Sequence, residues 1–444
     1  MRWTRYSDCG SRILTDWSSR LGLRSNLARN TVWMFLGAGL RLLIQALYFI
    51  AIARALGVGN YGAFIGVLAL VSIAVPFGDL GTGNLLVQNV SLNKNCFATY
   101  WGRSLVTTAT FGSALTVIVL LLSHLVLPSS IPMQLVFLIS MSDILWLNII
   151  TTCGQAFQAF DQLNWMATLN VLISAGRLIA ASILIHIHPH PSALQWGSFY
   201  SSSTILVAST ALFLVWSKLG APNFSWRRSI AEIREGCYFS ASLSAQTIYN
   251  DIDKTMLARL GTLEVTGIYG AAYRLIDVSF VPVSSLLFAS YPGFFRSGAE
   301  GISSCLRYAK PLLLRSVAYS VFICAVLLVS AGAITRVLGP EYAHTTEALR
   351  WLAILPILRA VQFFFCNALT GAGYQGLRAG VQVVVALFNI GFNLWIIPLY
   401  SWRGAAWSSL ASDALLALGV GAAALILSRR SRTVPANANA NALI

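Results

Sequence analysis

Long apolar stretches alternate with short polar or Pro/Gly-containing breaks along almost the whole chain. A helix needs about 20 mostly apolar residues to cross a bilayer, and the stretches reach that length. The pattern therefore predicts an all-α integral membrane protein with twelve transmembrane helices. The predicted spans are 30–52, 62–86, 104–127, 132–157, 165–186, 194–216, 237–259, 264–291, 312–335, 346–369, 377–398 and 402–427.

The composition agrees with this pattern. The 444 residues are 57% hydrophobic and only 10% charged, whereas soluble proteins carry about 25% charged residues. The formal net charge is +15, but the sequence offers no soluble domain on which a basic stripe could bind nucleic acid. Cytoplasmic loops of membrane proteins carry an excess of Lys and Arg, so the charge favours a multi-pass protein.

Lys and Arg are concentrated in the loops on the side of the N-terminus when the twelve spans are threaded in order. The positive-inside rule then places both termini in the cytoplasm. We expect a basic cytoplasmic tail, an N-lobe of six spans, a cytoplasmic linker, a C-lobe of six spans and a disordered cytoplasmic tail. These segments are 1–29, 30–216, 217–236, 237–427 and 428–444.

Two segments half a chain apart resemble each other, "ARALGVGNYGAF" at 53–64 and "ARLGTLEVTGIYGAA" at 258–272. Six spans return the chain to its starting side, so the two halves would run parallel and be related by an axis along the membrane normal. Transporters built from such repeats hold their substrate between the halves. The residues that match are Arg54 with Arg259, Gly62 with Gly270 and Pro76 with Pro282.

Five basic residues remain inside the predicted spans once those near the span ends are assigned to the loops. Each would cost roughly 2.5–3.5 kcal/mol at the bilayer centre if it faced lipid. We therefore expect these residues to face the bundle interior or a polar lumen between the halves, where they would bind an anionic substrate. They are Arg41, Arg177, Lys254, Arg274 and Arg359.

Two of these cations have an acid three residues away. Lys254 follows Asp251, and Arg274 precedes Asp277, at a spacing that places each pair on one helix face. An ion pair within the helix is therefore expected for both. Asp253 is left over next to Lys254, and we treat it as a candidate for coupling to an ion.

The other three arginines have no acid within four residues. Two interpretations are open, because such an arginine can face a lumen that binds an anion or pair with an acid on another helix. The acids available for pairing are Asp79, Asp143 and Asp413, and Asp79 is also a candidate for ion coupling.

Uncharged polar residues continue the stripes that carry these charges. Such side chains can line a lumen, or they can hydrogen-bond neighbouring helices to each other. The candidates for the lumen are Gln45, Gln246, Tyr249 and Asn389.

Three stretches together resemble the polysaccharide transporter family, the O-antigen and exopolysaccharide repeat-unit flippases of the MATE-like superfamily. They are "ARALGVGNYGAF", "PFGDLGTGNLLVQ" at 76–88 and "YNDIDKTMLARLGTLEVTGIYGAAYRL" at 249–275. The resemblance implies a MATE-like fold of two lobes and the flipping of undecaprenyl-pyrophosphate-linked oligosaccharide across a bacterial inner membrane. It also implies a cationic lumen, membrane lipid as the surroundings, and polymerase or assembly proteins as further partners.

Other function classes fit the sequence less well. A MATE-type cation or multidrug antiporter remains the alternative, because acids also lie within the spans. An enzyme is not expected: the "DID" motif at 251–253 lies inside a span, where nucleotide sugars are absent. No nucleotide-binding loop is present in the sequence, and neither a cofactor nor a metal is expected.

Overall fold

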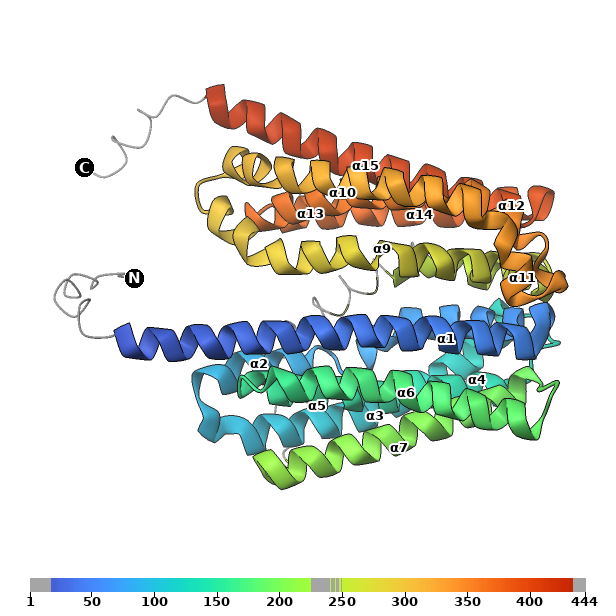
Figure 1. The fold of residues 1–444 in the computed structure, drawn as a ribbon, viewed down its shortest axis with the longest axis horizontal. Helices are drawn as coiled ribbons and strands as arrows, with labels where there is room; N and C mark the ends of the chain where they lie inside the picture. Colours follow the sequence, from blue (N-terminus) through green and yellow to red (C-terminus); the bar gives the residue numbers. More distant parts are fainter. Residues whose placement is uncertain (1–16, 225–239, 241–243, 245–246, 249, 434–444) are drawn as a thin grey trace.

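The computed structural model describes residues 17–224, 240, 244, 247–248 and 250–433, with side chains from Gly39 onward. All regular secondary structure in this part of the chain is helical. Figure 1 shows two groups of helices, α1–α7 and α9–α15, which lie side by side with α1 and α9 facing each other. The all-α prediction is confirmed for the described residues.

The first group contains nine elements. They are α1 (Trp17–Gly78), α2 (Thr82–Leu92), η1 (Lys94–Cys96), α3 (Phe97–Val126), α4 (Met133–Ser140), the π-helical η2 (Met141–Trp146), α5 (Leu147–Ala159), α6 (Leu163–Ile187) and α7 (Ala193–Leu219). The second group follows residues 250–260, which are also helical. It comprises α9 (Leu263–Gly298), α10 (Ile302–Ser330), η3 (Ala331–Ala333), α11 (Ile334–Leu338), η4 (Pro340–Tyr342), α12 (Thr345–Leu352), α13 (Leu355–Gly371), α14 (Gln375–Tyr400) and α15 (Trp402–Thr433).

Helix α1 consists of two segments that fold back on each other at Gly57. Gly57 has φ 68° and ψ 171°, a backbone conformation outside the helical region that is essentially restricted to glycine. The rings of Phe49 and Tyr61 are 6.0 Å apart, whereas twelve residues of straight helix would separate them by about 18 Å. The two segments correspond to the first two predicted spans.

Nine helical stretches of the described part are long and apolar enough to cross a membrane, when helical elements that follow each other closely, such as α1 and α2, are counted as one. Six of the predicted spans match single helices within several residues, namely those at α3, α6, α7, α9, α14 and α15. Helix α9 matches a predicted span but is not among the nine. The count of twelve spans therefore stays a prediction.

The distribution of apolar and charged side chains is the reverse of that in a soluble protein. Leu125 and Val329 are 73% and 88% exposed, whereas Asp253 and Arg359 are 0% and 6% exposed. Apolar residues such as Val67 and Tyr269 from the two groups share the largest buried cluster. Apolar surface around charged interior is expected when lipid is the solvent.

The ends of the chain differ from the predicted boundaries. Helix α1 begins at Trp17, within the predicted tail 1–29, and α15 continues to Thr433, into the predicted disordered tail 428–444. Both predicted boundaries mark the end of the apolar stretch, which is the part of the helix inside the membrane. The helices themselves continue beyond it into polar residues. The linker 217–236 lies largely outside the described residues, although α7 includes its first residues.

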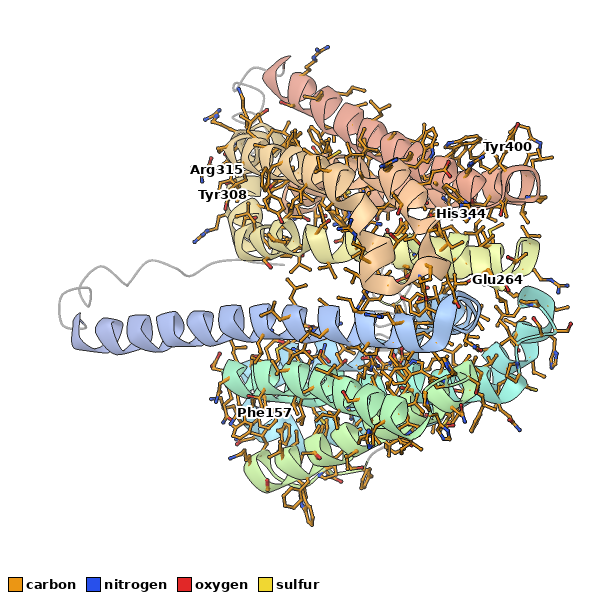
Figure 2. All side chains as sticks on the ribbon, turned by 45° about the vertical axis from the view of Figure 1, so that its right-hand side comes forward. Phe157, Glu264, Tyr308, Arg315, His344 and Tyr400 are labelled. Atoms are coloured by element: carbon orange, nitrogen blue, oxygen red, sulfur yellow. The ribbon has the colours of Figure 1, made fainter. Side chains whose placement is uncertain are left out.

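The two ends of the bundle can be followed in Figure 2. Phe157, Tyr308 and Arg315 lie near one end, and Glu264, His344 and Tyr400 lie near the other. Gly57 belongs to the second of these ends, because the backbone around it contacts Glu264 and Glu341. We call it the Gly57 end.

Candidate functional site

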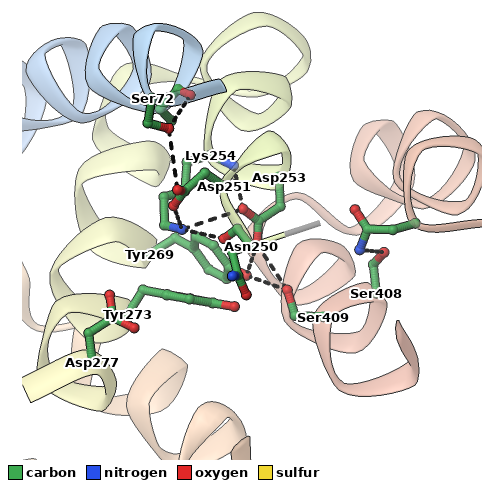
Figure 3. Close-up of polar contacts among 12 residues, drawn as sticks. Ser72, Asn250, Asp251, Asp253, Lys254, Tyr269, Tyr273, Asp277, Ser408 and Ser409 are labelled. Atoms are coloured by element: carbon green, nitrogen blue, oxygen red, sulfur yellow. Dashed lines mark hydrogen bonds and ion pairs between the residues drawn. The ribbon is translucent and has the colours of Figure 1, made fainter. Parts of the chain in front are cut away.

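Lys254 lies in a polar network next to α1 (Figure 3). Its Nζ is 2.7 Å from Asp251 Oδ1, and it donates a 2.7 Å hydrogen bond to the carbonyl of Asn250. The ammonium also lies 3.9 Å from the centre of the Tyr273 ring. Ser72 of α1 donates to Asp251 Oδ2 at 3.3 Å. The predicted ion pair within the helix is therefore present, and it is tied to the first group.

Asp253 is completely buried and has several partners. Its Oδ2 accepts hydrogen bonds from the hydroxyl of Tyr269 on α9 and, at 2.9 Å, from that of Ser409 on α15. Its Oδ1 accepts from the backbone N–H of Lys254 at 2.8 Å and lies 3.7 Å from the ammonium of the same residue. The carboxylate that the sequence left without a partner thus joins three helical segments (Figure 3).

Arg359 on α13 is neutralised by two acids from other helices. Its Nη1 is 2.8 Å from Asp277 Oδ1, its Nε is 3.7 Å from Asp413 Oδ2, and its Nη2 donates to the hydroxyl of Tyr273 at 2.8 Å. Gln362 donates to the other oxygen of Asp413 at 3.0 Å. Of the two interpretations left open by the sequence, pairing across helices is the one observed.

Arg274 does not form its predicted ion pair. The carboxylate of Asp277 bonds to Arg359 instead, and no acid contacts Arg274 among the described residues. A pair three residues apart contributes only about 0.2–0.5 kcal/mol, less than a charge pair shielded from water. The guanidinium of Arg274 lines a cavity instead.

Arg177 on α6 is also paired across helices. Its Nη2 is 3.2 Å from Asp143 Oδ1, and its guanidinium lies 4.1 Å from the centre of the Tyr200 ring. Tyr200 donates to the other oxygen of Asp143 at 3.1 Å, and Ser142 donates to Oδ1 at 3.0 Å. Asp143 belongs to η2, and π-helical turns are frequent at functional sites.

Arg41 on α1 is exposed and has no acid partner among the described side chains. Arg41 and Arg274 are thus the two uncompensated cations of the predicted set. One comes from each group of helices.

A cavity of about 220 Å³ lies between the second segment of α1 and the second group. Its wall on α1 is mainly apolar, and its opposite wall carries charges of both signs. The lining residues are Ile65, Leu68, Ala69, Ser72, Asp251, Lys254, Gly270, Arg274 and Asp277.

Two of the four predicted uncharged lumen residues lie in the described part of the chain, and their surroundings differ. Gln45 is half-buried on α1, one turn after Arg41. Asn389 is fully buried and donates to Ser412 of α15 at 2.9 Å. It therefore bonds α14 to α15 and does not face a lumen. Gln246 and Tyr249 lie outside the described residues.

Asp79 has a structural contact that the sequence did not predict. Its carboxylate accepts hydrogen bonds from the backbone of Gly81 at 3.1 Å and Gly83 at 3.3 Å. The chain turns here with positive φ at Leu80 and Gly81. A carboxylate at this position satisfies N–H groups at the start of α2.

Tyr200 and Tyr273 were not identified from the sequence, although each places its ring against an arginine or a lysine. A signal was available for Tyr273: Tyr269, Tyr273 and Asp277 follow each other at intervals of four residues, on one face of α9. No comparable spacing in the sequence indicates Tyr200, because its partners Asp143 and Arg177 lie on other helices.

Comparison with known proteins gives the chain a family. The family model described as polysaccharide biosynthesis protein matches residues 27–297, which is more than half of the 444 residues. The chain belongs to the polysaccharide biosynthesis protein family. No curated protein matches this chain at a significant level.

Solved transporters share the fold of this polysaccharide biosynthesis protein. An inward-facing multidrug resistance transporter of the MATE family matches with a TM-score of 0.74 and 14% identity over 90% of this chain and 100% of that one. An outward-facing MATE transporter gives 0.64, with 12% identity over 91% and 97%. A MOP-superfamily transporter from Pyrococcus furiosus, described as having a binding pocket of reverse polarity, gives a TM-score of 0.62, with 12% identity over 91% of this chain and 96% of that one.

At these identities the likeness concerns the fold. The protein is a multi-pass integral membrane protein with a MATE-like fold. Family and fold together agree with the prediction that the chain is not an enzyme.

Proposed function

We propose that this protein is a flippase that moves undecaprenyl-pyrophosphate-linked oligosaccharide units across the bacterial inner membrane for O-antigen or exopolysaccharide assembly. Family membership supports a lipid-linked sugar substrate. In this proposal 30–216 and 237–427 form two six-span lobes with both termini in the cytoplasm. The lobes alternate access to a site between them, as transporters with internal repeats do.

The pair of uncompensated arginines carries the proposal. Guanidinium groups match phosphate oxygens with two parallel hydrogen bonds. Arg41 and Arg274 come from opposite helix groups, and neither has an acid partner among the described residues, so a pyrophosphate between the groups would compensate both charges. Arg177, Lys254 and Arg359 already have carboxylate partners, so they hold the site in shape.

Complementation of a flippase-null bacterium tests this assignment. Wild type should restore surface polysaccharide, and Arg41→Ala and Arg274→Ala should lower it about tenfold or more, since each removes hydrogen bonds to a charged group. Arg336→Ala is the matched control, because Arg336 is exposed at the Gly57 end and outside the site. Normal polysaccharide from both site variants at equal membrane levels would refute the assignment.

Ion coupling is proposed for Asp253. Four carboxylates, Asp251, Asp253, Asp277 and Asp413, lie around two paired cations, Lys254 and Arg359, and Arg274 lines the same cavity as two of these acids. One negative charge in excess inside a membrane protein favours uptake of a proton or metal cation. Asp79 is less suited, because its carboxylate already caps α2. Transport in vesicles should depend on a proton or sodium gradient, and Asp253→Asn should remove that dependence.

The same acidic excess supports one alternative, a MATE-type antiporter for cationic compounds. The two proposals differ in the charge of the cargo. A wild-type protein that exports cationic dyes, and does not complement the flippase-null strain, would establish the antiporter.

A further inference from the structure

The two helix groups touch through their backbones at the Gly57 end. A Cβ on Gly62 of α1 would lie only 1.7 Å from the carbonyl oxygen of Leu263, and one on Gly267 of α9 would lie 2.1 Å from that of Val58. No side chain fits at either position. Glycine allows such close approach of two backbones.

The close contact continues one turn further into the molecule. A Cβ on Gly66 would lie 2.8 Å from the Cβ of Ala258, and one on Gly270 would lie 2.8 Å from the side chain of Ile65. Gly62 and Gly270 are matched positions of the predicted internal repeat. This contact therefore has a glycine on each side.

Residues 339–342 cross from the second group to the first, and we call this segment the latch. Glu341 Oε2 accepts a 3.2 Å hydrogen bond from the backbone N–H of Val58. Tyr342 is buried and donates a 2.8 Å hydrogen bond to the carbonyl of Ala53. Its ring also packs edge-on against Tyr61.

These two bonds satisfy backbone groups that the break at Gly57 leaves without helical partners. The last four carbonyls of one helical segment and the first N–H groups of the next have no partner within their own helix. Ala53 O belongs to the first set and Val58 N to the second, on either side of Gly57. The first group therefore depends on the second to complete its own helix ends.

We propose that the latch holds the two helix groups together at the Gly57 end, and that this end opens only when the Glu341 and Tyr342 bonds break. In both Figures 1 and 2 the groups lie closer at this end than at the opposite end. The latch controls whether the two helix groups separate at the Gly57 end. It is independent of the substrate and of the site between Arg41 and Arg274.

Cysteine labelling from one side of the membrane tests the latch. Leu68 lines the cavity between the groups, so Leu68→Cys reports access to it by a membrane-impermeant maleimide. Glu264→Cys, exposed at the Gly57 end, identifies the vesicle orientation that presents this end. The same protein without the introduced cysteine gives the background from native cysteines.

In the Leu68→Cys protein, Glu341→Ala should raise the labelling rate from the Gly57 side about tenfold or more, because a hydrogen bond to a charged group is lost. Glu347→Ala is the matched control. Glu347 is exposed and bonds Arg403 at 2.9 Å within the second group, so its removal should leave the rate unchanged.

A substitution that adds a side chain at the contact between α1 and α9 provides a second, independent test. Gly62→Ala should also raise labelling, because its Cβ would force α1 away from α9, whereas Gly39→Ala on the same helix meets nothing within 4 Å and should not. Unchanged labelling in Glu341→Ala overturns the latch. If that variant does not reach the membrane, Tyr342→Phe, which removes one hydroxyl and keeps the ring, decides in the same way.

Discussion

At the scale of residues, charge compensation separates the five basic residues into two kinds. Arg177, Lys254 and Arg359 each meet a carboxylate and an aromatic ring. Arg41 and Arg274 meet neither among the described residues. Removal of one partner of a buried pair leaves an uncompensated charge, whereas removal of both can be nearly neutral.

The pair of Asp143 and Arg177 gives a prediction at this scale. Asp143→Ala should destabilise the protein by about 3 kcal/mol, because Arg177 is left in the interior without its carboxylate. The double variant Asp143→Ala/Arg177→Met should recover part of this loss. Thermal unfolding in detergent micelles measures both effects.

Glu347→Ala is the control for that experiment. Its partner Arg403 is 52% exposed, and such surface pairs contribute about 0–1 kcal/mol. Equal melting temperatures for Asp143→Ala and Glu347→Ala would contradict a structural role for the interior pair.

At the scale of elements, breaks within helices determine where functional groups lie. Gly57 divides α1 into two antiparallel segments, so that Ser72 in the second segment reaches Asp251 of the polar network. The π-helical η2 carries Asp143, which faces Arg177 on α6. The break at Gly57 falls between the first two predicted spans, whereas the π-helical turn lies inside the predicted span 132–157, where the apolar pattern gives no sign of it.

Gly57→Ala tests the break in α1. The observed φ of 68° and ψ of 171° cost a non-glycine residue about 1–3 kcal/mol. The added Cβ would also lie 2.8 Å from the carboxylate of Glu341. The melting temperature should fall, whereas Gly39→Ala, inside a regular helical stretch with free space around it, should leave it unchanged or higher. A stable Gly57→Ala protein would be inconsistent with this backbone conformation.

At the scale of the whole molecule, two groups of helices meet mainly through α1 and α9, and the polar network lies beside that contact. The contact is tight at the Gly57 end and includes glycines from both groups. This arrangement agrees with a transporter in which one group moves against the other.

The proposed topology predicts that both termini face the cytoplasm. A fluorescent reporter that folds only in the cytoplasm should be active on either terminus, since an even number of spans returns the chain to its starting side. Activity at only one terminus would require an odd number of spans. A reporter placed after Leu219 serves as an internal control, because that position is also predicted to be cytoplasmic.

The sequence by itself determined that the protein is helical, lies in a membrane and carries Arg177, Lys254 and Arg359 in its interior, whereas Arg41 is exposed. Six of the predicted spans match single helices within several residues, because the length of an apolar stretch is a local property set by bilayer thickness. The pair of Lys254 with Asp251 was also predictable, since three residues along a helix fix their proximity. The family resemblance was likewise carried by contiguous stretches.

Only the tertiary structure decided which charges compensate each other. Arg177 pairs with Asp143, and Arg359 with Asp277 and Asp413, across helices that are far apart in the sequence. Such pairing depends on how the helices pack and rotate, which no local pattern specifies. For the same reason Arg274, with an acid three residues away, is uncompensated, and Asn389 bonds two helices in place of lining a lumen.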